Sequence, residues 1–377
     1  MRICILQVLH EPFDKRVFHK EAKSLAKAGH EILSITPSEH PVEPVDGIRF
    51  EVIPPAHSLK GRLRSVLRLI AKGRRAQADA YLAVEPESWV AALVLKMLTG
   101  RKVVFDVHEH IPSSFANFFP SLLRPAIERV TAFMMRLFAR FTDHIILTKM
   151  SLDEPFEGLS VPRTLVLNTN HLQAPCAGIP DDLKQAYGAR PTIIHQGIFG
   201  DVRGSYQLLD AMEIVAREIP DVKCILLGKY MYGDEAQFRD AIERRGLAPF
   251  IDMIAEVPFD RVPPYIAVSR VGLILFQPIG LGHTLGMPHK MFDYMREGVP
   301  LIAPSFAVEI RRIVEESHSG LLVEVTDPKD IARAILHLLR NEDEARQLGQ
   351  NGRAMVEAKY HWGYDEQRLL DVFASLR

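Results

Sequence analysis

The sequence predicts an α/β protein with two domains, each built on a parallel sheet. Short apolar segments alternate with amphipathic ones along the whole chain, which is the pattern of parallel strands covered by helices on both faces. The 377 residues exceed what one hydrophobic core normally organises. A turn-rich stretch at 168–189 separates two such series of similar length. We therefore expect two Rossmann-like domains that face each other across a cleft, with ligands at the carboxyl ends of the strands.

The first series predicts a domain over residues 1–175. It opens with a strand at 3–6, a helix over 18–28 and a second strand at 31–35. Apolar runs then predict strands at 80–83, 103–106 and 144–147.

The second series predicts a domain over residues 176–360. Its expected strands are 192–195, 224–228, 253–254, 272–275, 301–302 and 320–323. A last helix lies within 361–377, and its position allows a return to the first domain.

Composition narrows the class of protein. Hydrophobic residues make up 47% and charged residues 25%, as in ordinary globular proteins. The net charge of −1 combines +5 over residues 1–175 with −6 over the remainder. Cys4, Cys176 and Cys224 form no CxxC pair and fit a reducing compartment. Residues 1–9 have the pattern of a strand rather than a signal peptide, no segment predicts a bilayer span, and we expect a cytoplasmic protein.

Residues 287–305, MPHKMFDYMREGVPLIAPS, form the most informative segment. Pro288 suits a first helical turn, Gly298 a left-handed stop, and the apolar residues after Pro300 a core strand. The helix start, preceded by a loop with three glycines at 279–286, suits a phosphate or diphosphate.

Two charged residues lie on this predicted helix. Lys290 would add a positive charge to the phosphate site, and Asp293, three residues later, could accept hydrogen bonds from a ribose. An ordinary αβ unit with both side chains solvated is the alternative.

Five segments, in order along the chain, resemble the retaining glycosyltransferases of family 4, which have the two-domain GT-B fold. They are PFDKRVFHKEAKSLAKAGHEI (12–32), VVFDVHEHIP (103–112), HQGIFGDVRGSYQLLDAM (195–212), ILLGK (225–229) and PHKMFDYMREGVPLIAPS (288–305). The resemblance implies a UDP- or GDP-sugar donor held by the second domain and an acceptor held by the first. It also implies retention of configuration and a reaction without metal or cofactor.

The resemblance assigns donor-side residues. Arg203 matches the basic residue on the donor diphosphate, and Asp293 matches the acid that holds the ribose. Glu256 and Val257 lie in the segment that matches the strand end reading the base. The donor-side set is completed by Gly197, Gly228, Gly282, His283, Thr284 and Leu285.

Two positions depart from the family pattern. Leu285 stands where the acid that contacts the donor sugar would be, and Ile198 stands where an arginine would be. Branches with a Pro-x-Lys-x-Phe-Glu/Asp-Tyr pattern also lack that acid. Lys290 is expected to replace the missing charge, and the backbone of 282–285 the sugar contact.

The expected chemistry is stabilisation of a departing diphosphate. Arg203 and Lys290 would balance its developing charge, and the acceptor hydroxyl would lose its proton to the leaving phosphate, so we name no protein nucleophile. His108, after a predicted strand, is the third catalytic candidate and would orient the donor sugar or the acceptor. A histidine that only satisfies loop carbonyls is its alternative.

Four further residues are expected on the acceptor side. Asp14, Arg16, Glu85 and Glu109 all follow predicted strands of the first domain. A local salt bridge that caps the helix is the alternative for Asp14 and Arg16, and an ordinary surface acid is the alternative for Glu85.

A basic segment suggests a membrane surface. Residues 60–75, KGRLRSVLRLIAKGRR, carry seven basic residues and no acid, with Leu63, Val66, Leu67 and Ile70 at helical spacing. An ordinary helix packed on the sheet has the same pattern. A second apolar region lies at 115–138, and a lipid-linked acceptor would explain both. Nucleic acid is disfavoured because the basic run lacks aromatic residues.

We therefore expect a glycosyltransferase of polysaccharide or glycoconjugate biosynthesis, in the cytoplasm or on the inner face of the cell membrane. The departures at Ile198 and Leu285 favour one alternative, a non-catalytic scaffold or partner subunit. A sugar-nucleotide epimerase or hydrolase on the same fold is another.

Overall fold

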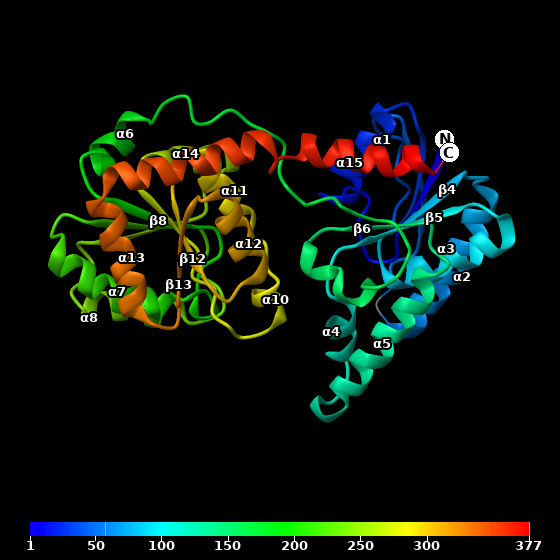
Figure 1. Ribbon diagram of the computed structural model, residues 1–377, viewed down its shortest axis with the longest axis horizontal. Coiled ribbons are helices and arrows are strands. Elements are labelled where there is room, and N and C mark those ends of the chain that lie inside the picture. The colour runs from blue at the N-terminus through cyan, green and yellow to red at the C-terminus, as the bar shows by residue number, and fades with distance from the viewer. Residues whose placement is uncertain (57, 377) are drawn as a thin grey trace. The chain divides into compact units, whose positions relative to one another are not determined.

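The computed structural model describes residues 1–56 and 58–376, which form two compact units (Figure 1). Unit 1 is Met1–Asn168 together with the segment from Trp362 onward, and unit 2 is Thr169–His361. The division lies earlier than the expected boundary at 175, because Asn168 accepts a hydrogen bond from Lys20 Nζ at 2.6 Å, within unit 1. Arg377, the end of the expected last segment, lies outside the described residues.

Within the described residues, unit 1 is built on a seven-stranded parallel sheet in the order β3-β2-β1-β4-β5-β6-β7. The strands are β1 (Arg2–Leu6), β2 (Glu31–Pro37), β3 (Ile48–Ile53), β4 (Ala80–Ala83), β5 (Lys102–Val107), β6 (His144–Leu147) and β7 (Arg163–Leu165). The five expected strands are present. The sequence does not indicate β3, an edge strand that carries Arg49 and Glu51, or β7, which has only three half-buried residues.

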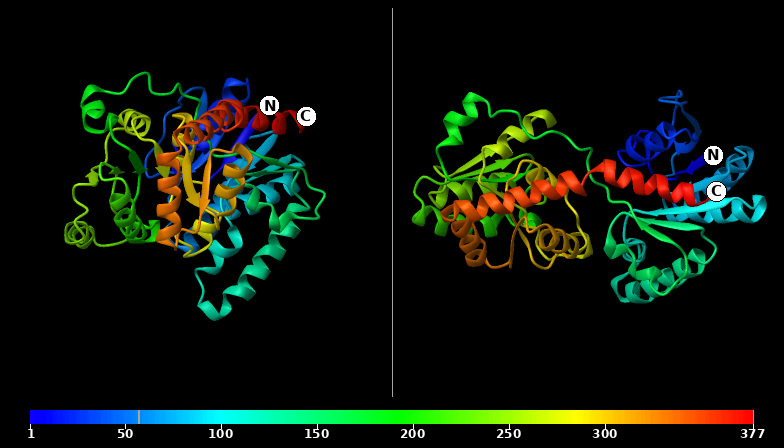
Figure 2. Two further views of the ribbon diagram at one scale, coloured as in Figure 1. Left: turned by 60° about the vertical axis from the view of Figure 1, so that its left-hand side comes forward. Right: turned by 45° about the horizontal axis from the view of Figure 1, so that its top comes forward.

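Helices cover both faces of this sheet. They are α1 (Lys23–Lys27), preceded by π-helical turns at Val17–Ala22, then α2 (Leu59–Arg75), α3 (Pro86–Thr99), α4 (Ile111–Ala116), α5 (Arg124–Ala139) and α15 (Trp362–Ser375). On one face Trp89 stacks on Phe105 with ring centroids 3.9 Å apart. On the other, Trp362 of α15 donates from Nε1 to Ser24 Oγ at 3.1 Å. Figure 2 shows α15, in red, against the blue N-terminal segment, so the last helix completes the core of unit 1.

Unit 2 has the same architecture of a parallel sheet with helices. Its described residues form a six-stranded sheet in the order β10-β9-β8-β11-β12-β13. The strands are β8 (Thr192–Gln196), β9 (Lys223–Leu227), β10 (Ile251–Ile254), β11 (Val271–Leu273), β12 (Leu301–Pro304) and β13 (Gly320–Val323). The helices are α6 (Asp181–Leu183), α7 (Ser205–Glu218), α8 (Glu235–Arg244), α9 (Val262–Ala267), α10 (Leu281–Thr284), α11 (His289–Arg296), α12 (Val308–Ser317), α13 (Pro328–Arg340) and α14 (Glu342–Ala358). All six expected strands are present. The predicted helix stop at Gly298 is confirmed by its left-handed φ of 71°.

The strand order reverses at one point in each sheet, between β1 and β4 in unit 1 and between β8 and β11 in unit 2. In parallel sheets of this kind, ligands bind outside the carboxyl ends of the strands at such a switch point. The segments that follow these four strands, together with β5 beside β4, are therefore where a site is expected.

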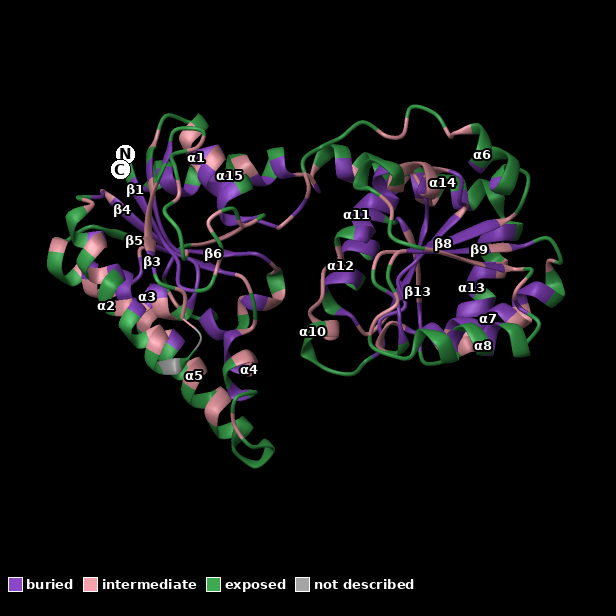
Figure 3. Cartoon of the chain, turned by 180° about the vertical axis from the view of Figure 1, so that it is seen from behind, coloured by how far each residue is buried: buried purple, intermediate pink, exposed green. Residues whose placement is uncertain are grey.

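The basic helix and the apolar region form one exposed surface of unit 1. In α2, Leu69 is buried, whereas Leu63 and Leu67 are 62% and 68% exposed. The α4–α5 hairpin extends away from the sheet, and its tip is exposed (Figure 3). The guanidinium of Arg62 lies 6.0 Å from the ring centroid of Phe118, so the start of α2 adjoins that tip. Among the described residues, we find no helix with both the length and the apolar character to cross a bilayer.

Candidate functional site

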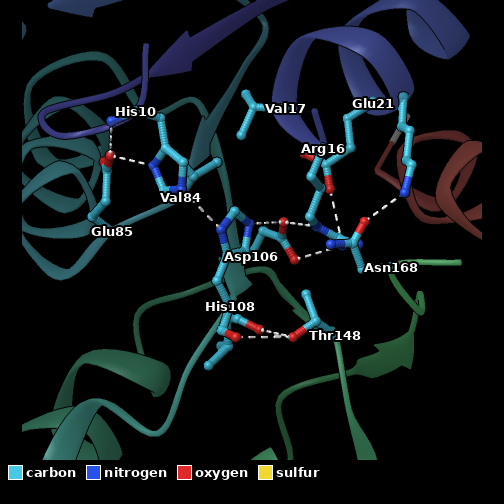
Figure 4. A network of polar contacts seen from close by, with 12 residues as sticks. His10, Arg16, Val17, Glu21, Val84, Glu85, Asp106, His108, Thr148 and Asn168 are labelled. Atoms are coloured by element: carbon cyan, nitrogen blue, oxygen red, sulfur yellow. Dashed lines mark hydrogen bonds and ion pairs between the residues drawn. The ribbon is translucent and has the colours of Figure 1, made fainter. Parts of the chain in front are cut away.

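A chain of polar side chains lies at the switch point of unit 1 (Figure 4). Glu85, which precedes α3, accepts hydrogen bonds from His10 Nδ1 at 2.6 Å and from the backbone amides of Val8, Leu9 and His10 at 3.0 to 3.2 Å. His10 Nε2 faces His108 Nδ1 at 3.3 Å, and His108 Nε2 contacts Asp106 Oδ2 at 2.5 Å. The loops after β1, β4 and β5 thus meet in one network.

Arg16 continues this network into the core. Its guanidinium donates from Nε and Nη2 to both carboxylate oxygens of Asp106, at 2.9 and 3.0 Å, and lies 2.9 Å from Glu21 Oε1. Burial raises the pKa of Asp106, but Arg16 and His108 outweigh burial and hold that pKa well below its ordinary value. Burial and the charge of Asp106 raise the pKa of Glu21. Although Glu21, Asp106 and His108 have metal-ligand spacing, Arg16 already engages both carboxylates.

The acceptor-side candidates occupy different positions in this network. Asp14 caps the π-helical turns by accepting from the amides of Arg16 and Val17 at 2.8 Å, which confirms the helix cap of the alternative interpretation. The local salt bridge of that interpretation is wrong, because the Arg16 side chain pairs with Asp106 and Glu21. Arg16 is buried in the ion pair just described, and Glu85 is 4% exposed. Glu109 is exposed to solvent. A hollow of about 390 Å³ opens beside the network at the ends of β1 to β3, and it is lined mainly by Val8, Leu9, Pro12, Pro37, Pro55 and Ala56.

A second cluster lies at the switch point of unit 2. Lys290, in the first turn of α11, is 8% exposed, and its Nζ lies 3.0 Å from His195 Nε2 at the end of β8. Burial and the nearby Arg203 lower the pKa of Lys290 well below its ordinary value. Burial, Lys290 and Arg203 likewise lower the pKa of His195. Among the described residues, neither Lys290 nor Arg203 has an ion-pair partner.

The guanidinium of Arg203 packs against an aromatic ring and, among the described residues, forms no ion pair. Its guanidinium lies 4.1 Å from the ring centroid of Phe276, which also stacks on His283 at 5.0 Å. The turn that carries Arg203 ends at Gly204, with φ of 80°, where a Cβ would lie 2.6 Å from the Leu275 carbonyl oxygen. Only glycine fits this close approach, so the backbone fixes the position of Arg203.

Close backbone packing also explains two of the predicted glycines. A Cβ at Gly228 would lie 2.4 Å from the carbonyl oxygen of Gly197, and both residues have positive φ. The segments leaving β8 and β9 can therefore come together beside Lys290, whose Nζ would lie 3.8 Å from a Cβ at Gly197.

Asp293 lies one turn beyond Lys290 and is also buried. Its carboxylate accepts from Gln196 Nε2 at 3.0 Å and from Arg296 Nη1 at 3.3 Å. Burial raises its pKa. The side chain is thus neither solvated, as the alternative required, nor without partners.

Of the remaining donor-side candidates, His283 is linked to this cluster through the ring of Phe276, on which Arg203 also packs. Thr284 and His283 lie on the single-turn helix α10, where His283 Nδ1 contacts the Gln277 carbonyl oxygen at 2.7 Å. Gly282 has open space where a side chain would be. Glu256 is exposed and Val257 half-buried, just after β10.

Protein-family models match both units. The family model described as "Glycosyl transferase 4-like domain" matches residues 15–169, and the one described as "Glycosyl transferases group 1" matches residues 190–341. The chain belongs to the group 1 glycosyl transferases. The narrower resemblance to the retaining family 4 stays a prediction.

The curated relatives of the chain are distant in sequence. A GDP-mannose-dependent alpha-(1-6)-phosphatidylinositol monomannoside mannosyltransferase of Mycobacterium tuberculosis is 24% identical over 193 residues, covering 50% of this chain and 49% of that protein. Spore coat protein SA of Bacillus subtilis is 23% identical, covering 49% of each chain. The chain thus spans about half the length of the curated relatives it matches.

Solved structures match the fold over the whole chain. Anabaena Alr3699/HepE in complex with UDP has a TM-score of 0.74 at 15% identity, with 100% of both chains covered. WaaG, a glycosyltransferase involved in lipopolysaccharide biosynthesis, has a TM-score of 0.62 at 13% identity, with 98% of both chains covered. The fold prediction, an α/β protein of GT-B type, is confirmed.

Three residues in these two clusters were not predicted as site residues from the sequence. His10 lies in the loop after β1, and His195 and Gln196 end β8. For His195 and Gln196 the signal was present, because polar residues that close an apolar strand mark the carboxyl edge of a parallel sheet. His10 lies four residues beyond the end of β1 and carries no such signal.

Proposed function

We propose that the chain is a glycosyltransferase that moves a sugar from a nucleotide-diphosphate donor to a glycan or lipid-linked acceptor with retention of configuration. The carrying observation is the pair of cations, Lys290 and Arg203, at the switch point of unit 2 without an ion-pair partner among the described residues. Lys290 is buried and Arg203 is half-buried, and although the charge of Asp293 acts on Lys290, burial and Arg203 outweigh it and lower the pKa of Lys290. Positive charge that is so incompletely balanced favours a bound anion. The names of the relatives support this proposal.

In the proposed reaction, Arg203 and Lys290 stabilise the charge that develops on the departing diphosphate, in place of a metal ion or cofactor. The acceptor hydroxyl passes its proton to the leaving phosphate, so no protein nucleophile is required. Asp293, whose carboxylate already accepts hydrogen bonds from Gln196 and Arg296, holds the ribose.

Other groups complete the two substrate sites. Backbone groups of 282–285 contact the donor sugar, and Glu256 and Val257 flank the base of a UDP- or GDP-sugar. His108, which contacts His10 in the loop after β1, and the exposed Glu109 serve the acceptor side.

Calorimetry with UDP and GDP, each with and without its common sugars, tests the proposal. One of the two nucleotides is expected to bind, and Arg203→Ala should weaken that binding about 10²-fold because a charged hydrogen-bond donor is lost. Arg217→Ala, on the exposed face of α7, is the matched control. Failure of both nucleotides to bind would favour the scaffold alternative.

We further propose that unit 1 lies on an anionic membrane surface and meets a lipid-linked acceptor there. Between residues 111 and 142 the sequence has four arginines and a single acid, Glu128. Phe118, Leu122 and Phe133 are 73%, 90% and 66% exposed. Arg62 of α2, which also pairs with Glu87, adjoins Phe118. Exposed apolar side chains rimmed by basic ones suit the interface of an anionic bilayer.

Sedimentation with vesicles tests this second proposal. Changing Arg62, Arg64 and Arg68 to glutamine should reduce binding to anionic vesicles about 10²-fold at low salt, since each basic residue contributes about 1 kcal/mol near the surface. The difference should shrink as salt rises. Changing Arg333, Arg340 and Arg346, exposed on unit 2, is the control. Unchanged binding by the α2 variant, or equal binding to neutral vesicles, would contradict the proposal.

A further inference from the structure

Two histidines of unit 1 lie back to back between two carboxylates. His10 Nδ1 contacts Glu85 Oε1 at 2.6 Å, His10 Nε2 faces His108 Nδ1 at 3.3 Å, and His108 Nε2 contacts Asp106 Oδ2 at 2.5 Å (Figure 4). The imidazole rings are nearly perpendicular, with centroids 5.0 Å apart. All four ring nitrogens are therefore engaged within the protein.

The outer two nitrogens must both carry hydrogen. Glu85 already accepts from three backbone amides, which stabilises its ionised form, so it accepts from His10 Nδ1–H. Asp106 is paired through both oxygens with Arg16 and is likewise ionised, so it accepts from His108 Nε2–H. An ionised carboxylate offers only acceptors, which leaves no other assignment.

The inner two nitrogens then present a conflict. A neutral imidazole has one N–H, so two neutral rings would leave bare His10 Nε2 and bare His108 Nδ1 facing each other at 3.3 Å. Two lone pairs at this distance repel each other. One additional proton between them replaces the repulsion with an N–H···N hydrogen bond.

We propose that His10 and His108 hold one such extra proton in common, and that His10 is thereby a positioning residue for His108. The pair is then a monocation whose rings are fixed at both ends. This role rests on the proposed transferase function, whereas the shared proton does not.

The surrounding charges favour this monocation. Glu85 lies beyond His10, Asp106 beyond His108, and Asp14, after β1, interacts electrostatically with both rings. Arg16 opposes them, but it is paired with Asp106 and Glu21. Burial lowers the pKa of His10, but the hydrogen bond and charge of Glu85 outweigh burial and raise that pKa above its ordinary value. A second extra proton would place two cations side by side, so the pair should take up only one.

Nuclear magnetic resonance of the full chain, with nitrogen-15 in the histidine rings, tests the shared proton directly. His10→Gln and His108→Gln assign the two rings, and His40→Gln, at an exposed loop position, is the matched control. In the unmodified chain the His10 ring should gain its extra proton at a pH above the ordinary histidine value of about 6.5, and the nitrogen-15 shift of His108 Nδ1 should change in the same step. Glu85→Gln should lower the midpoint of that step by about one pH unit or more.

Two independent titrations, or a midpoint that Glu85→Gln leaves unchanged, would overturn the shared proton. These measurements need no nucleotide sugar, so they remain decisive if the transferase proposal fails. The positioning role is tested by the pH profile of transfer. His10→Gln should lower kcat with little change in KM and move the alkaline limb of the profile to lower pH. An unchanged profile would overturn the positioning role, because a merely structural contact does not set the pH dependence.

Discussion

Replacing Lys290 with methionine is expected to weaken nucleotide binding about 10²-fold while leaving the protein as stable as before, or more stable. Methionine keeps the length and apolar stem of lysine but removes the buried amine. In the unliganded protein that amine contacts His195, and burial and the charge of Arg203 together outweigh the favourable charge of Asp293, so its removal relieves a cost. With a diphosphate bound, the same amine would be a charged donor.

The pH dependence of the free energy of unfolding provides a second test of this prediction. The pKa of Lys290 is lowered in the folded protein, so the unfolded chain binds more protons between that value and the ordinary lysine pKa of about 10.4. The free energy of unfolding should therefore rise with pH through this window in the unmodified chain. In Lys290→Met this contribution should be absent.

Calorimetry and denaturant unfolding measure the two effects separately. Lys329→Met, at an exposed position on α13, is the control and should change neither. Parallel loss of affinity and stability in Lys290→Met would mean that the lysine is a structural residue rather than part of an anion site.

Replacing Arg16 with methionine is expected to cost about 3 to 5 kcal/mol of unfolding free energy, the usual result of removing one partner of a buried pair. Asp106 and Glu21 are both 0% exposed and would lose the cation they share. Arg16→Lys keeps a charge but not the two-oxygen contact with Asp106, so its cost should be smaller.

Acid unfolding distinguishes this mechanism from a simple packing defect. Because the folded pKa of Asp106 is lowered, its stabilisation is complete above the unfolded value of about 3.9 and is lost as pH falls through the folded value. Arg16→Met should lack much of this acid-sensitive component. Arg140→Met, on the exposed end of α5, is the control. A loss of less than about 1 kcal/mol for Arg16→Met would contradict the buried-pair account.

Most of the fold follows from periodicity, because strands buried on both faces appear as uninterrupted apolar runs. The strands missed, β3 and β7, lie at sheet edges, where polar residues are tolerated and the pattern weakens. The sequence likewise marked Lys290 and Asp293 through their spacing in segment 287–305, and Arg203 through the family resemblance of segment 195–212.

Residue roles that depend on distant contacts were not predictable. The sequence marked Glu85 as a candidate acid after a strand, yet its hydrogen bonds come from amides 75 to 77 positions away, brought close by the pairing of β1 with β4. His10 was missed for the same reason, since only the fold brings it to His108. Burial of Arg16 depends equally on Asp106, 90 positions later.

The return of α15 to unit 1 has a consequence for biosynthesis. Residues 169–361 leave the ribosome between the two parts of unit 1, a delay of roughly 10 to 40 s at ordinary translation rates. Throughout that interval the first sheet lacks Trp362 and Phe373, which are fully buried in its finished core. Unit 2 has its whole chain before unit 1 does, so unit 1, although its first part is made earlier, is completed last.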